Sequence, residues 1–378
     1  MLLGLGGGIR ALSIILFGLI GGAVADRTDR RRLLFITQSG FALASLALGA
    51  LVLSGQVTFW HIYIFSALNG ALGSFDAPAR RSLFPNLVPR EEMQNAVVLN
   101  AAVFRLARLV GPAIGGVIIA TYGPAISYFV NFASYAAILL ALAAMRATPR
   151  PARRRSPILR DVADGLRYTL RRPLLRAVLI LESTHSFFGV NTALITIFAS
   201  DVLRTGPEGL GLLLSAQAFG ALVGTTALLV AGDMERKGRA MMVAGVAYCV
   251  ALALFAFARS FEVAAILLIA TAITDAFWTA MRNTMFQLQT DEAYRGRSLS
   301  TVLLAGRGFT QGAQLETGIA VSIGGPTFAV LSGAAVIATV LGLVNASTDS
   351  IRSYRGTPDP MTSVLAASVD GTSTGQGA

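Results

Sequence analysis

The sequence contains little charge and almost no cysteine. Only 13% of its 378 residues are charged, whereas soluble globular domains carry about 25%. Hydrophobic residues make up 54% of the chain, and they gather in runs of about 20 or more, the length that crosses a bilayer as a helix. This pattern excludes an ordinary soluble domain and indicates a membrane protein. The single cysteine, Cys249, excludes an intrachain disulfide.

Several motifs that would indicate other functions are also missing. No phosphate-binding loop of the form G-x-x-x-x-G-K-[ST] occurs, which disfavours a self-contained ATP-driven pump. No Ser/His/Asp arrangement or metal-ligand spacing is visible, so we expect neither an enzyme nor a bound metal or cofactor. The net charge of +11 would suit nucleic acid, but the basic residues lie in short stretches between apolar runs. We therefore expect no nucleic-acid partner.

The apolar runs predict an all-α polytopic membrane protein, because backbone groups in lipid must form their hydrogen bonds within a helix. Eleven spans are predicted, and each has a length suited to cross the bilayer. They are Leu2–Val24, Leu33–Ser54, Phe59–Phe75, Ala96–Ala120, Pro124–Met145, Pro173–Phe198, Leu210–Ala231, Ala240–Phe257, Val263–Ala280, Leu299–Ile323 and Pro326–Val344.

The basic residues predict how these spans are oriented. One set of connections, together with the C-terminal segment, holds 25 basic residues, whereas the alternate connections hold only Arg204 and Arg259. Arginine and lysine collect on the cytoplasmic side of a membrane protein. We therefore expect the C-terminus and the loops after Val24, Phe75, Met145 and Ala231 to be cytoplasmic.

The polar stretches divide the chain into four parts. We expect an N-terminal helical bundle at residues 1–145, a cytoplasmic linker at 146–172, a C-terminal helical bundle at 173–346 and a disordered tail at 347–378. Within the linker, Ser156 and Pro157 are suited to begin an amphipathic helix that lies on the membrane surface.

The two bundles resemble each other in sequence. "FDAPARRSLF" from Phe75 is similar to "FWTAMRNTMF" from Phe277, and "ADRTDRRR" from Ala25 has a weaker copy in "GDMERKGR" from Gly232. In both pairs, the second stretch follows the first after nearly the same number of residues. This pattern is typical of the duplicated halves of transporters.

Four motifs together resemble the major facilitator superfamily over about Leu2 to Val344. The pattern G-x-x-x-D-R-x-x-R-R-R from Gly22 resembles its signature loop, and "RLVGPAIGG" from Arg108 resembles the helix-5 motif of its drug:proton antiporters. "FDAPARRSLFPNLVPREEMQNAVVLN" and "FQLQTDEAYRGRSLS" resemble the branch that contains enterobactin exporters, macrolide efflux proteins and transmembrane secretion effectors.

The resemblance implies two pseudo-repeated bundles that form a secondary active transporter. Its expected activity is proton-coupled efflux of amphipathic small molecules of the drug, macrolide or siderophore type by alternating access, with the proton gradient as the energy source. We expect a monomer in the inner (plasma) membrane, in contact with the lipid bilayer and a small-molecule substrate. An importer of the same fold remains an alternative.

The sequence departs from the family pattern in two places. Ser66 stands where the family usually has an arginine in helix 4, and Met1 begins where helix 2 of an expected twelve should begin. We therefore expect that helix 1 is missing from the sequence. A non-transporting membrane protein with a regulatory or interaction role is the alternative if that helix is truly absent.

The signature loop implies a latch between conformations. A carboxylate at the end of a helix can accept charge-assisted hydrogen bonds or face the positive end of a neighbouring helix. Arg31 and Arg32 are expected only to hold the loop in the cytoplasm. The residues expected to form the latch are Gly22, Asp26, Arg27, Arg30 and, in the repeated copy, Asp233 and Lys237.

The helix-5 motif predicts close helix packing, which the family uses as a hinge or a barrier to leakage. Gly111, Gly115 and Gly116 would form a smooth face, and Pro112 would bend the helix one turn after Arg108.

Ionisable residues inside spans are functional candidates, because each costs about 2.5–3.5 kcal/mol on insertion scales. Our hypothesis is that the bundles face each other with opposite charges, and that protonation of an acid weakens its pairing to Arg105 or Arg108. Binding of an anionic substrate by these arginines and a static ion pair are the alternatives. The candidates for proton coupling or substrate binding are Arg105, Arg108, Glu182, His185, Asp275, Arg307 and Glu316.

Overall fold

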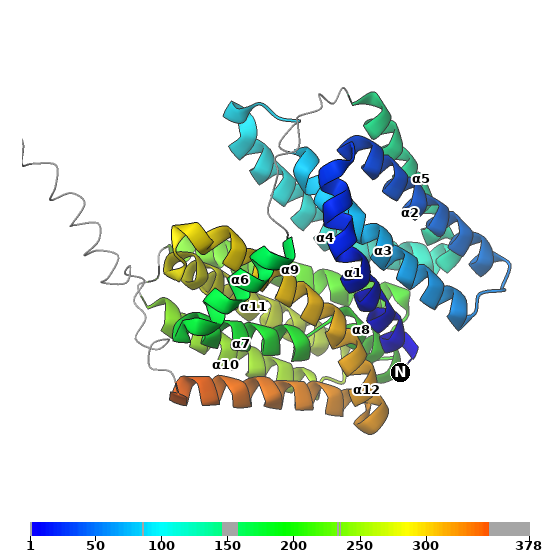
Figure 1. Cartoon of the computed structure of the whole chain (residues 1–378). Coiled ribbons are helices and arrows are strands. Elements are labelled where there is room, and N and C mark those ends of the chain that lie inside the picture. Colours follow the sequence, from blue (N-terminus) through cyan, green and yellow to red (C-terminus); the bar gives the residue numbers. More distant parts are fainter. Residues whose placement is uncertain (1, 85–86, 146–157, 233, 235, 348–378) are drawn as a thin grey trace, which may run out of the picture.

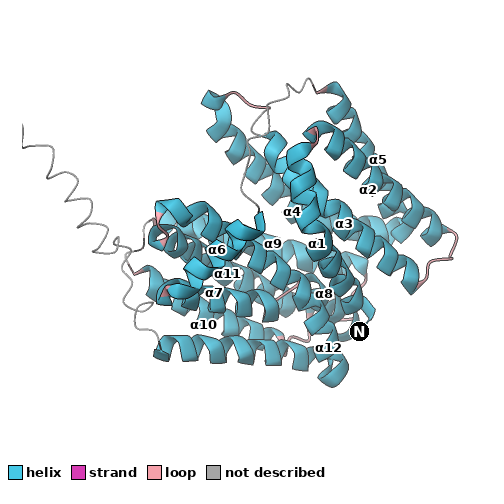
Figure 2. Ribbon diagram, in the orientation of Figure 1, coloured by secondary structure: helices cyan, strands magenta, loops and turns pink. Residues whose placement is uncertain are grey.

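The computed structural model describes residues 2–84, 87–145, 158–232, 234 and 236–347, and nearly all of them are helical, with no strand among them (Figure 2). The first part comprises α1 (Leu2–Arg27), α2 (Arg30–Leu53), α3 (Phe59–Leu83), the 3-10 helix η2 (Arg90–Glu92), α4 (Met93–Tyr122) and α5 (Pro124–Ala144). The second comprises α6 (Ile158–Arg171), α7 (Pro173–Phe188), α8 (Thr192–Ile197), the π-helix η3 (Phe198–Val202), α9 (Pro207–Ala231), α10 (Lys237–Phe255), α11 (Phe261–Gln289) and α12 (Glu292–Ser347).

The eleven predicted spans coincide with helix apart from a break at residues 189–191 inside Pro173–Phe198, which confirms the predicted all-α polytopic fold. The last two predicted spans share α12, where Gly325 (φ 80°, ψ 178°) and the following Pro326 interrupt the helix. Eight helical segments within the described ranges are long and apolar enough to cross a membrane. The expected start of the linker helix at Ser156 and Pro157 and the expected disordered tail from residue 348 lie outside the described residues.

Two predicted span ends are wrong, because α3 and α11 continue well beyond Phe75 and Ala280. Hydropathy ended both spans where charged residues begin. Arg80 and Arg282 were therefore assigned to cytoplasmic loops, yet both lie inside these helices. Inside these continuations Arg80 Nη2 lies 3.1 Å from Asp76, and Arg282 binds Glu182.

The helices form two bundles, α1–α5 and α6–α12, which meet along α1 and α4 of the first and α9 and α12 of the second (Figure 1). In the first bundle, α1 packs on α3 and α2 packs on α5. In the second, α9 and α10 both pack on α11, and α12 packs on α7. This arrangement leaves α4 and α9 facing each other between the bundles.

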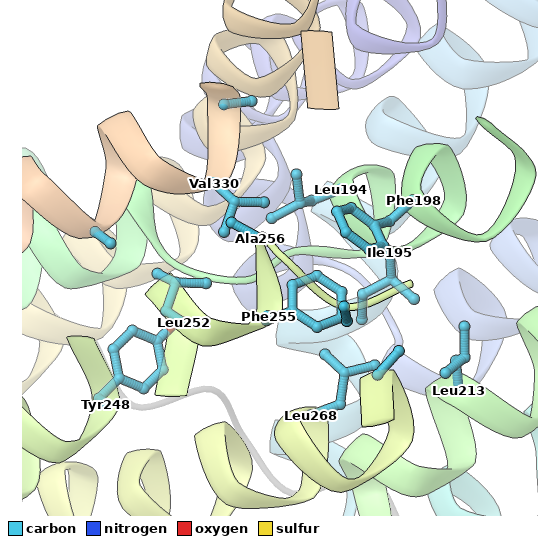
Figure 3. Packing of buried hydrophobic residues seen from close by; sticks show 14 of the residues in the cluster. Leu194, Ile195, Phe198, Leu213, Tyr248, Leu252, Phe255, Ala256, Leu268 and Val330 are labelled. Carbon is cyan, nitrogen blue, oxygen red and sulfur yellow. The ribbon is translucent and has the colours of Figure 1, made fainter. Parts of the chain in front are cut away.

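The second bundle contains a large apolar core around α8 and η3. Ile195, Phe198 and Phe255 are completely buried there, and the rings of Phe198 and Phe255 lie 4.4 Å apart between centroids (Figure 3). The cluster also includes Leu268 of α11 and Val330 of the second part of α12. These contacts fix the helices of this bundle to one another at the end where η3 leads into α9.

The linker helix α6 packs on α7 and α12 and so belongs to the second bundle, while its position on the membrane surface stays a prediction. Arg172 Nη2 lies 2.6 Å from the Asp291 carboxylate, and the Tyr168 hydroxyl accepts a hydrogen bond of 3.0 Å from the Asp291 N–H. Burial raises the pKa of the Tyr168 phenol, so it stays neutral beside that carboxylate. The turn between α11 and α12 is thereby fastened to the linker.

The bundles approach most closely where α4 crosses α9, and the approach depends on two glycines. A methyl group added at Gly116 would lie 2.6 Å from the Pro207 carbonyl oxygen, and one added at Gly211 would meet the Pro112 carbonyl oxygen. Any larger side chain would separate the helices. The prediction of a smooth face across the whole helix-5 motif is wrong, because Gly111 and Gly115 have open space where a methyl group would stand.

The neighbouring glycines Gly115 and Gly116 should respond differently to the same substitution. Gly116→Ala should force α4 and α9 apart and destabilise the protein by about 1–3 kcal/mol, the usual cost of overpacking. Gly115→Ala adds the same methyl group where it has room, so it should leave stability nearly unchanged. Apparent unfolding temperatures of the purified proteins in detergent measure both effects. Equal shifts in the apparent unfolding temperature of the two variants would contradict the close approach of α4 and α9 at Gly116.

Candidate binding site between the two bundles

A cavity of about 810 Å³ lies between the bundles, within the size range of small-molecule sites. Its wall on the first-bundle side is α4, which contributes Arg105, Arg108 and Pro112. The opposite walls come from α7, α9, α10, α11 and the first part of α12. The cavity therefore borders the α4–α9 crossing, so a bound molecule would touch both bundles.

A buried ion pair joins α7 and α11 at this cavity. Glu182 Oε1 binds the Arg282 guanidinium, and the two side chains are only 8% and 10% exposed. The same carboxylate accepts hydrogen bonds from Ser186 Oγ (3.0 Å) and from Trp278 Nε1 (3.3 Å). A buried charge pair is tolerated when further hydrogen bonds occupy the remaining lone pairs, as they do here.

A second pair lies beside the first, one turn along α7. His185 Nε2 lies 3.6 Å from Asp275 Oδ1, which is an ion-pair distance but too long for a strong hydrogen bond. The imidazole is held between two aromatic rings, stacked on Trp278 (5.2 Å between centroids) and tilted against Tyr248 (4.3 Å). The Asp275 side chain is 47% exposed and faces the cavity. Asp275 is thus the carboxylate that a proton or a ligand can reach.

Arg105 and Arg108 present their side chains to the cavity from the opposite wall. Both are exposed, and neither has a hydrogen bond or ion pair among the described residues. The predicted pairing of the acids with these arginines is absent in this conformation. Glu182 and Asp275 instead have nearer partners, Arg282 and His185, within their own bundle.

The other predicted residues lie elsewhere. Glu316 is half-buried on α12 and does not line the cavity, and the Arg307 side chain lies outside what the structure describes. Of the expected latch, Asp233, the surroundings of Gly22 and the side chains of Asp26 and Arg27 are likewise outside the described part. The remaining two latch residues, Arg30 and Lys237, begin α2 and α10.

Two basic residues of the signature loop and its copy bind backbone carbonyls. Arg31 donates to the carbonyl oxygens of Leu142 (2.6 Å) and Ala143 (2.7 Å), so it caps the C-terminal end of α5. Its predicted role was topology alone. Lys237 is buried and donates through Nζ to the Met234 carbonyl oxygen at 3.1 Å. The first contact joins the start of α2 to the end of α5, and the second joins the start of α10 to the segment before it.

Sequence reasoning missed Arg282 and Trp278, although the repeat contained a signal for both. In the alignment of "FDAPARRSLF" with "FWTAMRNTMF", Arg80 matches Arg282 and Asp76 matches Trp278. In the first bundle Asp76 binds Arg80 and accepts a hydrogen bond of 2.6 Å from Gln38. The shared arginine position therefore binds a carboxylate in each bundle.

The buried pair makes a quantitative prediction. Arg282→Gln should destabilise the protein by about 3–5 kcal/mol, because it leaves the Glu182 carboxylate buried without its partner. Adding Glu182→Gln should recover much of that loss. Apparent unfolding temperatures of the wild type, both single variants and the double variant complete a thermodynamic cycle.

An exposed pair supplies the control for that cycle. Asp291→Asn removes the surface contact to Arg172 and should cost only about 0–1 kcal/mol. Strictly additive effects of the two changes at Glu182 and Arg282 would show that these side chains do not interact.

Two helical bundles with a polar cavity between them are the arrangement of a secondary transporter of the major facilitator type, and the family and relatives that this chain matches place it in that class. The chain belongs to the transmembrane secretion effector family, whose model matches residues 8–361. It is 27% identical over 281 residues to the enterobactin exporter EntS of Shigella boydii serotype 18, covering 74% of this chain and 67% of that protein. EntS of Escherichia coli O81 is 26% identical over the same shares.

Solved transporters share the fold at low sequence identity. A variant of the nucleoside transporter NupG matches with a TM-score of 0.71 at 14% identity, covering 91% of this chain and 90% of that one. A bacterial homologue of the human lysosomal transporter Spinster, inward-facing and unoccupied, matches with a TM-score of 0.67 at 16% identity, covering 94% and 89%. The protein is therefore a multi-pass transporter of the inner membrane, embedded in lipid and acting on a small-molecule substrate, and it is not an enzyme.

Proposed function

We propose that this protein exports amphipathic small molecules, of the drug, macrolide or siderophore type, in exchange for protons. The observation that carries the proposal is the cavity in which Asp275 and His185 face Arg105 and Arg108 across the boundary between the bundles. The similarity to enterobactin exporters supports the outward direction.

Asp275 is the proposed site of proton exchange. Its carboxylate is open to the cavity, has His185 as its ion-pair partner, and lies within electrostatic reach of Arg108. Protonation would remove the negative charge that attracts Arg108 and so weaken the attraction between the bundles. Glu182 supports this site, because it holds Trp278 and Arg282 beneath His185.

The α4–α9 crossing is the proposed pivot of alternating access. If the arginine-rich loops face the cytoplasm, the crossing lies near the outer face, since Gly116 is close to the end of α4 and Gly211 is close to the start of α9. Gly7, near the start of α1, also packs on Gln314 of α12. These contacts hold the bundles together at the outer face and leave the cavity available to the cytoplasm.

The signature loop is the proposed latch for the opposite state. When the bundles close at the cytoplasmic face, Asp26 and Arg27 at the end of α1 and Arg30 at the start of α2 would bind the facing bundle, with Lys237 in the repeated position. Opening toward the cytoplasm would break those contacts, as rocking of one half against the other requires.

Transport into proteoliposomes with an acidic lumen tests the coupling. We expect wild-type protein to accumulate enterobactin while the proton gradient lasts, and to lose that accumulation when an uncoupler is added. Asp275→Asn should abolish gradient-driven accumulation but retain exchange of labelled for unlabelled probe, because only the proton site is removed. Glu316→Gln is the matched control and should behave like wild type, since Glu316 does not line the cavity.

Two outcomes would refute the proposal. Accumulation that is insensitive to the uncoupler would rule out proton coupling. Full gradient-driven accumulation by the Asp275→Asn variant would rule out Asp275 as the proton site.

A further inference from the structure

We propose that the substrate carries a compact oxyanion, a carboxylate or a phosphate, on an apolar body, and that Arg105 and Arg108 bind this group. The inference rests on the proposed function, because it assigns a substrate class to the same cavity. It concerns binding alone, however, and does not depend on the coupling ion.

The balance of charge in the cavity favours an anionic ligand. The lining holds three guanidinium groups against two carboxylates, so its formal charge is positive even when His185 is neutral. Glu182 is paired with Arg282 inside the second bundle. Arg105 and Arg108 have no such partner among the described residues, so the uncompensated charge of this site is positive. A site of that sign attracts an anion and disfavours a cationic substrate.

The placement of the two arginines suits a compact oxyanion. They are three residues apart on α4, so they share one face of the helix and lie about 5–6 Å apart at their Cβ atoms. Two guanidinium groups at this spacing repel each other until an anion lies between them. Guanidinium binds carboxylate and phosphate through paired N–H donors, which favours a compact oxyanion over a diffuse negative charge.

The opposite wall of the cavity suits an apolar body. Across the cavity, α9 presents one amide, Gln217, among small and aliphatic side chains: Leu214, Ala218, Ala221 and Leu222. Hydroxyl groups of Thr225 and Thr279 lie on the same side. An apolar body with a few hydrogen-bonding groups fits this surface, with its anion directed toward α4.

Anion binding would also act on the contact between the bundles. Arg108 precedes Pro112 by four residues, about one helical turn or 6 Å, and the Pro112 carbonyl meets Gly211 at the crossing. An oxyanion held by Arg108 and a body held by α9 would therefore join both sides of the crossing. The substrate would contact the two elements that must move relative to each other.

Three probes with one apolar body test the proposal: 1-naphthylacetate, 1-naphthyl phosphate and the uncharged 1-naphthylacetamide. Binding of radiolabelled probes is measured by equilibrium dialysis on the full-length protein in phosphatidylcholine nanodiscs, with empty discs subtracted. We expect one or both oxyanions to bind at least about tenfold more tightly than the amide, the factor that one charge-assisted hydrogen bond supplies.

Variants locate the effect. Arg105→Gln combined with Arg108→Gln should remove the preference for oxyanions while amide binding persists, which shows that the protein is folded. The corresponding double lysine variant should retain part of the preference, because it keeps the charge without the paired donors. Arg81→Gln is the matched control, since Arg81 is exposed at the end of α3 and does not line the cavity.

Three results would overturn the inference. Equal affinity of the wild type for all three probes would exclude an anion subsite, and a preference that survives the double glutamine variant would place it elsewhere. Loss of the preference when phosphatidylglycerol is added to the discs would assign the subsite to a lipid headgroup. No proton gradient is present in this assay, so its failure leaves proton coupling standing, and failure of the transport assay leaves the subsite standing.

Discussion

The cost of an unpaired charge in the membrane interior governs this structure more than any other constraint. Glu182 and Arg282 are both nearly buried, and each is tolerated because the other is present and because Ser186 and Trp278 complete the hydrogen bonds of the carboxylate. Arg105 and Arg108, which have no ion-pair partner among the described residues, lie at the cavity instead. This rule separates Arg282, which joins α7 to α11, from Arg105 and Arg108, which remain available to a ligand.

The two bundles satisfy that constraint differently at equivalent positions. In the first bundle Arg80 takes its carboxylate from Asp76, one turn earlier on the same helix, and Gln38 of α2 supports it. In the second bundle Trp278 replaces that aspartate, and the carboxylate comes from Glu182 on α7. The first arrangement stabilises α3 against α2, whereas the second ties two helices together under the cavity and places an indole against His185.

Hydropathy predicted which segments span the membrane, because the apolar runs are long and the connections between them are polar. It could not predict where α3 and α11 end, since Arg80 and Arg282 appear as loop residues until their partners are known. The cost of intramembrane charge singled out Glu182, His185 and Asp275 as candidates, and the structure places all three at one cavity with Arg105 and Arg108. The ion pairs that these residues form depend on which helices pack against each other. A single sequence shows which residues share one face of a helix, but it does not show which helix that face contacts.

The same limitation applies to the glycines of α4, and there it has a mechanistic meaning. Gly111, Gly115 and Gly116 are equivalent by composition, yet only Gly116 meets the facing helix, at Pro207 and Gly211. The closest approach within the long α4–α9 contact is made by one glycine from each helix, so the two backbones meet at that point. Because α4 also carries Arg105 and Arg108, any rotation about that point moves both guanidinium groups relative to Asp275. Packing and charge are therefore coupled through α4. A ligand that binds the arginines and a proton that neutralises Asp275 both act on the movement of α4 relative to the second bundle.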